Sequence, residues 1–418
     1  MKDYLLENLS LRNNNLKNMD NKKVNKKIAI IGPESYPIPA VRGGAIESGV
    51  TRTLNINEEE KRLDLTVFTI SDPLLEEAIK NYKNCRIIQI ARGGLLGFLI
   101  KKVYRVLRKF SGYRLPFRSA YMIRINKYLE KENFDLIAFH TSHEEVSQLS
   151  SKVKAKVIYS VASDYLTPDI PGITQLIERV DCFSSNQYII DRIHNLLGVG
   201  YEKLHAGKGG IDISLDSNEV RTGIRYGIRT KHNLTDKDVV VLYCGRLSPE
   251  KGALQLIQAV QKVPNCKLIV VGGANFSSNA QTEYVKSLKD AASKCNGRVI
   301  FTGYLDNHDD LKKYAYAADI AVVPSICNEA GSVALLEFRV VELPTIASDK
   351  GGMIHNAAGN VVFVRCDDNY VNNLAEAIGK LVRNPEERKK LSKLARIGIE
   401  DRSLEAKYDR LCDFYDSL

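Results

Sequence analysis

Two glutamates lie eight positions apart in the stretch NEAGSVALLE, residues 328–337, around a Gly-Ser step and an apolar run. A strand-like run ends just before this stretch, which places Glu329 on a loop. Ser332 is a suitable N-cap, so the sequence predicts a helix from Val333 onward with Glu337 about one turn in. Residues eight apart in a continuous helix are offset by about 80°. Only a loop followed by a helix can therefore point both carboxylates at one ligand.

Carboxylates accept hydrogen bonds from hydroxyl groups, so Glu329 and Glu337 suit sugar or ribose hydroxyls better than phosphate. Gly331 allows the backbone to approach a phosphate closely, and the start of the helix adds free amides. The alternative is purely structural. In that case Glu337 pairs with Arg339 or Lys350, and Glu329 is solvated.

A second cluster, CGRLSPEKG at residues 244–252, follows another apolar run. Its turn carries Arg246 and Lys251, and a helix is expected to start near Gly252. A guanidinium, an ammonium and the unpaired amides of a helix start together favour an anion. The cluster therefore suits a pyrophosphate, which it would neutralise as the group leaves. Cations are also common in surface turns without a function, so this motif alone leaves both interpretations open.

Two shorter motifs follow predicted strands in the first half of the chain. RGG at residues 42–44 opens a helix, where glycine lets the backbone approach a bound group, although Gly-Gly also simply makes turns. His140 ends the run FDLIAFH and either donates to a sugar hydroxyl or is structural. His143 and Glu144 follow it, but the set lacks the usual spacing and third ligand of a zinc site. No metal is expected.

Apolar runs alternate with helical patterns along almost the whole chain. One series runs from KIAIIG at residues 27–32 to VDCFSS at 180–185, and a second extends from residue 239 to residue 364. Such alternation predicts parallel βαβ units with helices on both sheet faces. We therefore predict an α/β fold of two doubly wound, Rossmann-like units with a boundary near residues 212–222. Ligands of such sheets bind beyond the carboxyl ends of the strands, where every motif above is expected to lie.

The composition is that of an ordinary globular protein. Of 418 residues, 44% are hydrophobic and 26% charged, which suits two domains of about 150–200 residues each. Eight scattered cysteines without a C-x-x-C pair argue against a disulfide framework and for a reducing compartment. Residues 1–26 are expected to be a flexible polar tail and not a secretory signal, and no apolar run is long enough to span a bilayer. A cytoplasmic protein is expected.

One segment concentrates basic charge. Residues 101–131 carry ten Lys or Arg residues and one acid, directly after GGLLGFLI. Basic side chains beside apolar ones favour a surface of anionic lipid. The expected membrane or acceptor patch consists of Lys101, Lys102, Arg105, Arg108 and Lys109. An ordinary solvated helix face is the alternative. Nucleic acid is not an expected partner, because no recognition motif accompanies the charge.

Taken in order, these motifs resemble those of the family-four glycosyltransferases with the GT-B fold. The resemblance covers nearly the whole chain from about Lys27 onward. The E-x7-E motif of the family corresponds to Glu329 and Glu337, and its G-R-x4-K-G motif corresponds to residues 245–252. The segments LPTIASDKGG, VIFTGYL and AADIAVVPS also match sequences that are typical of the family. RGGAIE resembles the subgroup that includes spore-coat and cell-envelope polysaccharide proteins.

The resemblance implies a nucleotide-sugar donor, expected to be UDP-linked. It implies that Arg246 and Lys251 hold the diphosphate and stabilise the departing nucleotide, and that Glu329 and His140 contact the donor sugar. These four are the predicted catalytic residues. The predicted donor-binding residues are Gly43, Gly44, Gly245, Gly303, Tyr304, Leu305, Gly331, Ser332, Val333 and Glu337. The last of these would accept from the ribose hydroxyls.

The implied reaction moves a hexosyl or N-acetylhexosaminyl unit, with retention of configuration, to a glycan or lipid-linked acceptor. Cell-envelope or capsular polysaccharide synthesis is the expected setting, with the protein peripheral at the inner face of the membrane. The implied domains are an acceptor domain at 27–215, a donor domain at 216–395 and a terminal helix at 396–418 that packs back on the first. No metal or other cofactor is expected, since protein cations and helix dipoles stabilise the diphosphate in this family and no D-x-D cluster ends a strand.

Two alternatives and two departures from the family pattern remain. The chain could instead be a nucleotide-sugar epimerase of the same fold, or a catalytically degenerate coat or scaffold protein. Glycine stands two places after Glu329 where the family usually has it three places after, and the usual P-N-G-x-D of the domain junction reads K-G-G-I-D at residues 208–212. These departures affect the details of the donor site more than the class.

Overall fold

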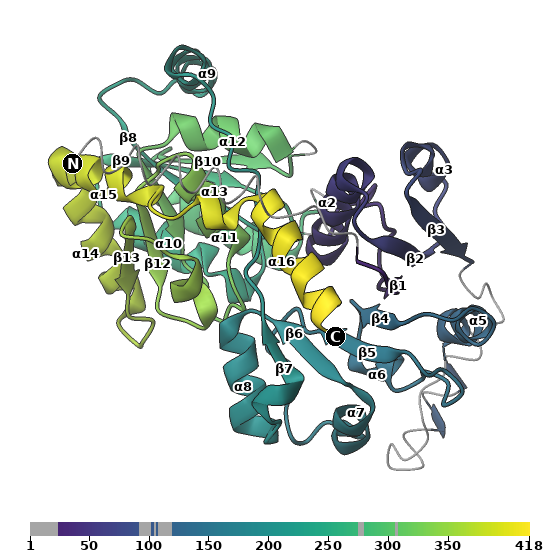
Figure 1. Cartoon of the computed structure of the whole chain (residues 1–418). Coiled ribbons are helices and arrows are strands. Elements are labelled where there is room, and N and C mark those ends of the chain that lie inside the picture. The colour runs from purple at the N-terminus through teal and green to yellow at the C-terminus, as the bar shows by residue number, and fades with distance from the viewer. Residues whose placement is uncertain (1–23, 92–101, 104–105, 108–118, 275–279, 306–307) are drawn as a thin grey trace, which may run out of the picture.

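The computed structural model describes residues 24–91, 102–103, 106–107, 119–274, 280–305 and 308–418. Two parallel sheets form two lobes, which lie side by side in Figure 1. Most of the expected polar tail lies outside the described residues, as do Lys101, Arg105, Arg108 and Lys109 of the basic patch. Lys102 is described and is exposed.

The amino-terminal sheet has seven parallel strands in the order β3-β2-β1-β4-β5-β6-β7. They are β1 (Lys27–Ile31), β2 (Asp64–Ile70), β3 (Cys85–Ile90), β4 (Leu136–Phe139), β5 (Lys156–Ser160), β6 (Cys182–Ser185) and β7 (Leu204–Ala206). The helices are α2 (Ala45–Glu60), α3 (Leu75–Ala78), α5 (Ala120–Leu129), α6 (His143–Val146), α7 (Ile173–Arg179) and α8 (Gln187–Leu197), with short 3-10 turns η1 (Ile79–Asn81) and η2 (Tyr201–Lys203). Ala29 and Ile31 of β1 enter one hydrophobic core, and Ile28 and Ile30 enter another. Both faces of the sheet are therefore covered.

The carboxy-terminal sheet has six parallel strands in the order β10-β9-β8-β11-β12-β13. They are β8 (Val239–Cys244), β9 (Cys266–Val271), β10 (Val299–Gly303), β11 (Ile320–Val323), β12 (Thr345–Ser348) and β13 (Val361–Val364). The helices that follow β7 in the chain are α9 (Asn218–Lys231), α10 (Ala253–Gln261), α11 (Glu283–Ser293), α12 (His308–Ala317), α13 (Val333–Val340), α14 (Tyr370–Arg383), α15 (Pro385–Ala395) and α16 (Leu404–Ser417), with turns η3 (Pro249–Lys251), η4 (Gly352–Asn356) and η5 (Glu400–Arg402). Val241 of β8 enters one hydrophobic core, and the next residue, Leu242, enters another. Both faces of this sheet are therefore covered as well.

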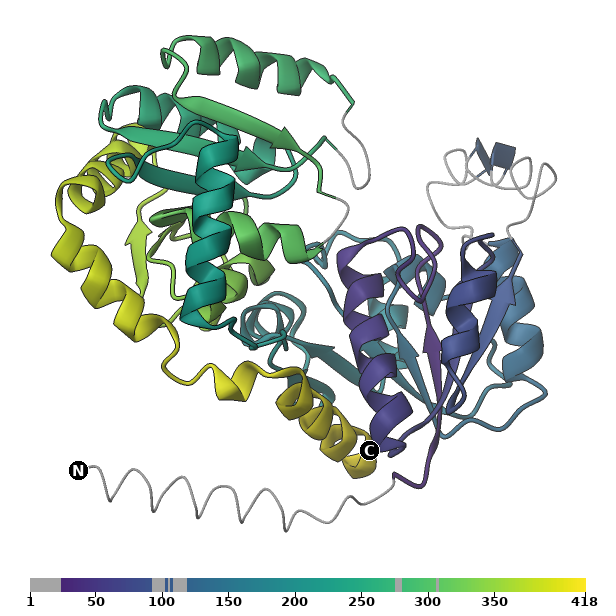
Figure 2. The same cartoon turned by 90° about the horizontal axis from the view of Figure 1, so that it is seen from above.

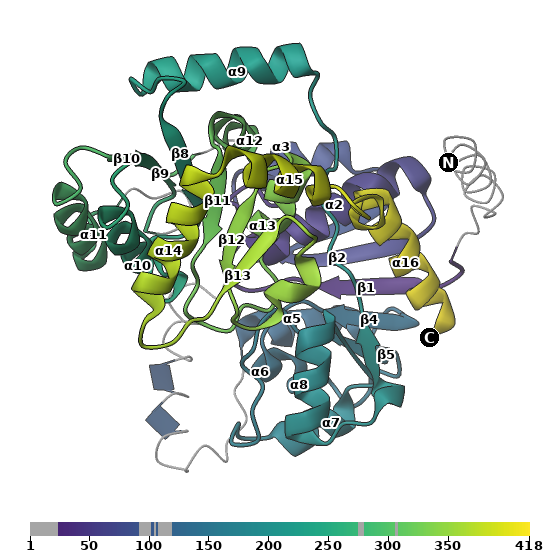
Figure 3. The same cartoon turned by 90° about the vertical axis from the view of Figure 1, so that its left-hand side faces the viewer.

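Two helices connect the lobes. α9 follows the last strand of the amino-terminal sheet and lies across the outside of the carboxy-terminal lobe (Figure 3). α16 returns to the amino-terminal lobe, where Figure 2 shows it beside α2. Tyr408 and Cys412 of α16 are buried in the same core as Ile28, and the Tyr408 hydroxyl donates to Asn57 Oδ1 over 2.5 Å. The end of the chain thus completes the core of the first lobe.

In both sheets the strand order reverses beside the first strand. β1 lies between β2 and β4, and β8 lies between β9 and β11. Such a reversal opens a crevice at the carboxyl ends of the strands, which is the usual ligand position in open α/β sheets. Within the described part of the chain, no helix is both long and apolar enough to cross a membrane.

Candidate functional site

An ion pair joins the two sides of the crevice in the carboxy-terminal sheet. Lys251 closes η3 after β8, and Glu329 lies on the loop after β11. Lys251 Nζ donates to Glu329 Oε1 over 2.6 Å, and Ser325 Oγ donates to the same oxygen over 2.6 Å. The two charged side chains are 23% and 15% exposed. The pair is therefore shielded from water but still open to a ligand.

Gly252 explains how Lys251, in the turn after β8, contacts a carboxylate on the loop after β11. Its φ is 72°, a backbone conformation that favours glycine. A Cβ at this position would overlap the carbonyl oxygen of Pro324, which follows β11. The turn after β8 is therefore pressed against the end of β11, and this close approach brings the lysine to its carboxylate partner.

The loop that carries Glu329 is held through its backbone. Gly352 N donates to Glu329 O over 2.6 Å, and Glu329 also forms an isolated parallel bridge with Gly351. A Cβ on Gly351 would overlap Glu329 O. The next residue, Ala330, packs on the main hydrophobic core of the amino-terminal lobe. The loop therefore contacts both lobes.

Arg246 lies beside this pair but is held more loosely. It follows Gly245 after β8, and its side chain is 45% exposed. Its Nη2 donates to Glu250 Oε1 over 3.4 Å, and its backbone oxygen accepts from the Tyr243 hydroxyl over 2.7 Å. The guanidinium can therefore turn toward an anion beside Lys251 at little cost.

The second glutamate of the E-x7-E motif lies where the sequence predicts. α13 begins at Val333 after the N-cap residue Ser332, although the Ser332 side chain makes no capping hydrogen bond. Glu337, one turn in, borders a cavity of about 260 Å³. Arg52 of α2 lines the same cavity, so the cavity lies between the two lobes. Gly331 lies on the loop just before this helix.

One structural alternative for Glu337 was an ion pair with Arg339, but the Arg339 guanidinium has other partners. The Arg339 guanidinium donates to the backbone oxygens of Ala395, Asn356 and Ile397 over 3.1, 3.1 and 2.9 Å. This arginine is 3% exposed, so its role is to join α13 to the segments after α15 and η4. The solvated alternative for Glu329 is wrong, because Glu329 is paired with Lys251 and only 15% exposed.

The predicted base contact follows β10 on the same edge of the sheet. Gly303 ends that strand with a φ of 78°, and Gly303 O accepts from Gly272 N over 3.0 Å. Tyr304 and Leu305 come next and are partly exposed. Because β10, β9 and β8 are neighbours, this segment lies along the same carboxyl edge as Arg246.

The amino-terminal lobe contributes its motifs from β1 and β4, the two strands at its own reversal point. Gly43 and Gly44 come directly before α2 with φ values of 78° and 102°. A Cβ on Gly44 would overlap the carboxylate of Glu47. His140 follows β4, and its backbone N donates to Ile31 O over 2.9 Å. All these motifs therefore end at one edge of the sheet.

His140 is neutral at neutral pH. Burial, with a smaller contribution from the charge of Lys407, lowers the pKa of the imidazole to about 4. A neutral imidazole both donates and accepts hydrogen bonds, as contact with a sugar hydroxyl requires. Among the described residues, no three His, Cys, Asp or Glu side chains are grouped so that they could hold a metal ion.

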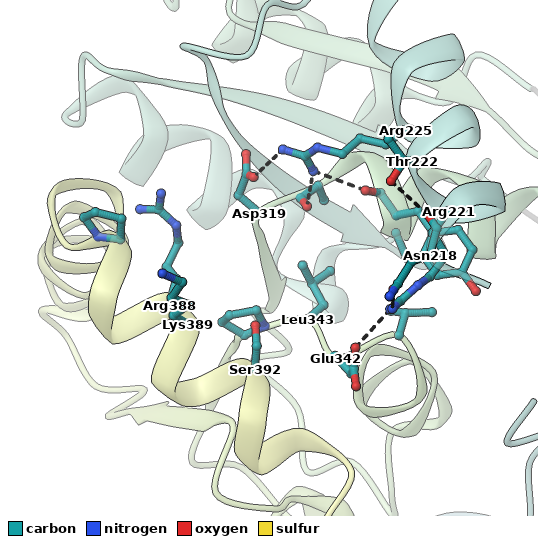
Figure 4. A pocket seen from close by; sticks show the side chains of 16 residues that line it. Asn218, Arg221, Thr222, Arg225, Asp319, Glu342, Leu343, Arg388, Lys389 and Ser392 are labelled. Atoms are coloured by element: carbon teal, nitrogen blue, oxygen red, sulfur yellow. Dashed lines mark hydrogen bonds and ion pairs between the residues drawn. The ribbon is translucent and has the colours of Figure 1, made fainter. Parts of the chain in front are cut away.

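A larger cavity, of about 390 Å³, lies at the opposite edge of the carboxy-terminal sheet (Figure 4). Arg225 of α9 donates to three carbonyls at the end of α12 and, over 2.7 Å, to Asp319. Arg221 Nη1 donates to Glu342 over 2.9 Å. These contacts tie α9 to the sheet at the amino-terminal ends of its strands. Sheets of this type bind ligands at the other edge, so we interpret these residues as structural.

Comparison with known proteins agrees with this geometry. Residues 226–397 match a family model described as Glycosyl transferases group 1. The chain is 26% identical over 395 residues, 90% of this chain and 88% of the other, to YtcC of Bacillus subtilis, itself named only provisionally as a glycosyltransferase. It is 34% identical over 131 residues, 30% of this chain and 34% of the other, to the lipopolysaccharide 1,2-N-acetylglucosaminetransferase of Salmonella typhimurium.

The solved structure of Anabaena Alr3699/HepE in complex with UDP is similar to this one with a TM-score of 0.72 and 18% identity, over 94% of this chain and 100% of that chain. The fold is GT-B. The predicted fold is thus confirmed. The similarity of residues 226–397 to group 1 glycosyl transferases agrees with the predicted family. The residues that sequence reasoning missed are Ser325 and Gly351, which hold Glu329 in place.

Proposed function

We propose that this protein is a retaining glycosyltransferase that moves a sugar from a nucleotide-sugar donor to a glycan or lipid-linked acceptor. The observation that carries the proposal is the pair between Lys251 and Glu329 at the reversal point of the sheet. A cation suited to a leaving diphosphate and a carboxylate suited to sugar hydroxyls lie within one hydrogen bond of each other. Arg246 adds a second cation on the same edge.

In this proposal the protein itself stabilises the leaving group. Negative charge develops on the diphosphate as the bond to the sugar breaks, and Lys251 and Arg246 would stabilise that charge. The amides at the start of α13 would add to this effect. Glu329 would accept from a hydroxyl of the donor sugar, and neutral His140 would contact the same sugar from the other lobe. No metal ion takes part in the proposed reaction.

A UDP-sugar is the proposed donor. The Anabaena protein was solved with UDP and also with UDP-glucose. The backbone at Gly303 to Leu305 would contact the base, and Glu337 would accept from the ribose hydroxyls, with Gly43 and Gly44 beside the phosphates. The Salmonella relative is named for N-acetylglucosamine transfer to lipopolysaccharide, and another relative is the spore coat protein SA of Bacillus subtilis. These names support a hexosyl or N-acetylhexosaminyl unit and a cell-envelope acceptor.

A panel of nucleotides tests the donor part of the proposal. UDP, GDP and ADP, and sugars linked to each, are added to the protein, and the midpoint of thermal unfolding is measured. We expect UDP and at least one UDP-sugar to raise the midpoint in the wild type, and the shift to shrink in Glu337→Gln. Absence of any shift with all three nucleotides would refute nucleotide-sugar binding, and a shift with GDP alone would refute the choice of uridine.

A further inference from the structure

A cluster of basic side chains lies where α16 crosses onto the amino-terminal lobe, and the proposed reaction does not use it. Lys407 and Arg410 are three residues apart and so lie on one side of α16. Lys407 Nζ donates to Gly49 O of α2 over 3.3 Å. Arg52 is three residues after Gly49, one turn further along α2. The three cations therefore gather between the two helices that lie side by side in Figure 2.

These cations have little negative charge to balance them. Arg410 Nη1 contacts Asp401 Oδ1 over 3.0 Å, but Lys208 contacts the other oxygen of Asp401 over 2.5 Å. Among the described residues, no carboxylate pairs with Arg52 or with Lys407. Asp401 thus contacts two of the four cations, Lys208 and Arg410. Two further carboxylates, Asp212 and Glu337, border the nearby cavity with Arg52, and Asp212 is exposed.

The cluster also contains donors without acceptors. Nε and Nη2 of Arg410 are buried and have no hydrogen-bond partner within the described part of the chain. Buried donors of this kind destabilise a fold unless something binds them. Loss of water around the amine, together with the charges of Arg52 and Arg410, lowers the pKa of Lys407 to about 8. Each observation indicates that a counter-ion would stabilise this place.

The cluster is within reach of a small ion. Arg52 lines the cavity of about 260 Å³ between the lobes, and the Arg410 side chain is 32% exposed. Guanidinium groups match the geometry of oxyanions and bind them with paired hydrogen bonds. We propose that Arg52, Lys407 and Arg410 form a binding site for a phosphate group at the joint between the lobes, separate from the pair of Lys251 and Glu329.

Titration with inorganic phosphate tests this proposal. The midpoint of thermal unfolding is measured against phosphate concentration at constant ionic strength, with chloride as the balancing anion. We expect phosphate to raise the midpoint in the wild type and equally in Lys251→Ala, which lacks the donor-site lysine. Arg410→Gln and Lys407→Met should bind phosphate at least about tenfold more weakly, the scale for one charge-assisted hydrogen bond.

The midpoint of thermal unfolding without phosphate is a second measurement, because there the loss of a basic side chain should not destabilise the protein. Lys407→Met keeps most of the side chain that packs on Gly210 but removes a charge from a repelling cluster. It should therefore melt at or above the wild-type midpoint without phosphate. Arg225→Gln is the matched control, because this arginine is paired with Asp319 (Figure 4). It should melt lower than the wild type and keep the full phosphate shift.

Three results would overturn the proposal. The first is a phosphate shift that is unchanged in both Arg410→Gln and Lys407→Met. The second is a shift that disappears in Lys251→Ala, because phosphate would then occupy the donor site. The third is the lack of any phosphate shift in the wild type. The test needs no transferase activity, so its failure and a failure of the proposed function are separate outcomes.

Discussion

Lys251 Nζ and Glu329 Oε1 lie 2.6 Å apart and join the ends of β8 and β11. The pair holds an ammonium and a carboxylate in place before any donor binds, and Ser325 Oγ donates to the same carboxylate oxygen. Groups that are already positioned need little reorganisation when charge develops. In the proposed reaction the donor would enter beside this pair, with its diphosphate next to the lysine and its sugar next to the glutamate.

Loss of either donor-site cation should slow transfer strongly. Lys251→Ala and Arg246→Ala are each expected to lower turnover by ~10²-fold or more, the scale for losing one preorganised charge stabiliser. Initial rates with a UDP-sugar measure the effect. Lys389→Ala is the control, because Lys389 is 72% exposed on α15 and its loss should leave the rate unchanged. Near-wild-type rates in both donor-site variants would exclude the proposed role.

Removal of the charge from Glu337 should weaken nucleotide binding. Glu337→Gln is expected to raise the Kd for UDP about tenfold, because a charged acceptor to the ribose hydroxyls is lost. Calorimetric titration measures the Kd. Glu342→Gln provides the comparison, since Glu342 pairs with Arg221 at the opposite edge of the sheet (Figure 4). Equal Kd values for wild type and Glu337→Gln would show that this glutamate is not a ligand of the nucleotide.

A side chain at residue 252 should disturb the site and the fold together. In Gly252→Ala the new Cβ would overlap Pro324 O at a φ of 72°, so the free energy of unfolding should fall by about 1–3 kcal/mol and transfer should slow. Gly223→Ala is the matched control. Gly223 lies within α9 with nothing near its added Cβ, so this change should stabilise the helix by up to about 1 kcal/mol. A fully stable and active Gly252→Ala would mean that the close approach has no role.

His140 should make the protein less stable in acid. Its pKa in the folded state is about 4, below the value near 6.5 of an unfolded chain. Between these values the unfolded chain binds a proton that the folded protein does not, so the free energy of unfolding falls as pH falls from about 6.5 toward 4. Denaturant unfolding across this range measures the slope. His140→Asn should show a shallower slope, and an identical slope in both proteins would contradict the pKa.

The basic patch is proposed to hold the protein at a membrane. Neutralising Lys101, Lys102, Arg105, Arg108 and Lys109 together should reduce co-sedimentation with anionic liposomes, since each favourably placed cation contributes about 1 kcal/mol. Liposomes of neutral lipid are the control. If the variant sediments as well as the wild type, the patch is an ordinary solvated surface.

The strands could be predicted because both faces of each sheet are buried, which leaves uninterrupted apolar runs such as Ile28 to Ile31. α9 was missed for a physical reason. It contains Gly223 and Gly227, and its one buried residue is Arg229. Its position depends on contacts with Asp319, about ninety residues away, which no local pattern reveals. β7 was also missed because it is three residues long.

The candidate site could be predicted as a set of residues but not as an arrangement. The E-x7-E spacing and Ser332 were enough to place Glu329 on a loop and Glu337 in a helix. The contact between Lys251 and Glu329 spans 78 residues and depends on the fit of Gly252 against Pro324. Such a fit follows from the packing of β8 against β11. The spacing of residues along the chain does not predict it.

Proton NMR of the reaction products tests the central claim most directly. The protein is incubated with an α-linked UDP-sugar and a glycan acceptor, and the anomeric signal of the new linkage is assigned. The account predicts an α-linked product, formed ~10²-fold more slowly by Lys251→Ala. A β-linked product would contradict retention. Isomerised free sugar formed without acceptor would indicate an epimerase, and UDP binding without any turnover across acceptors would contradict the account altogether.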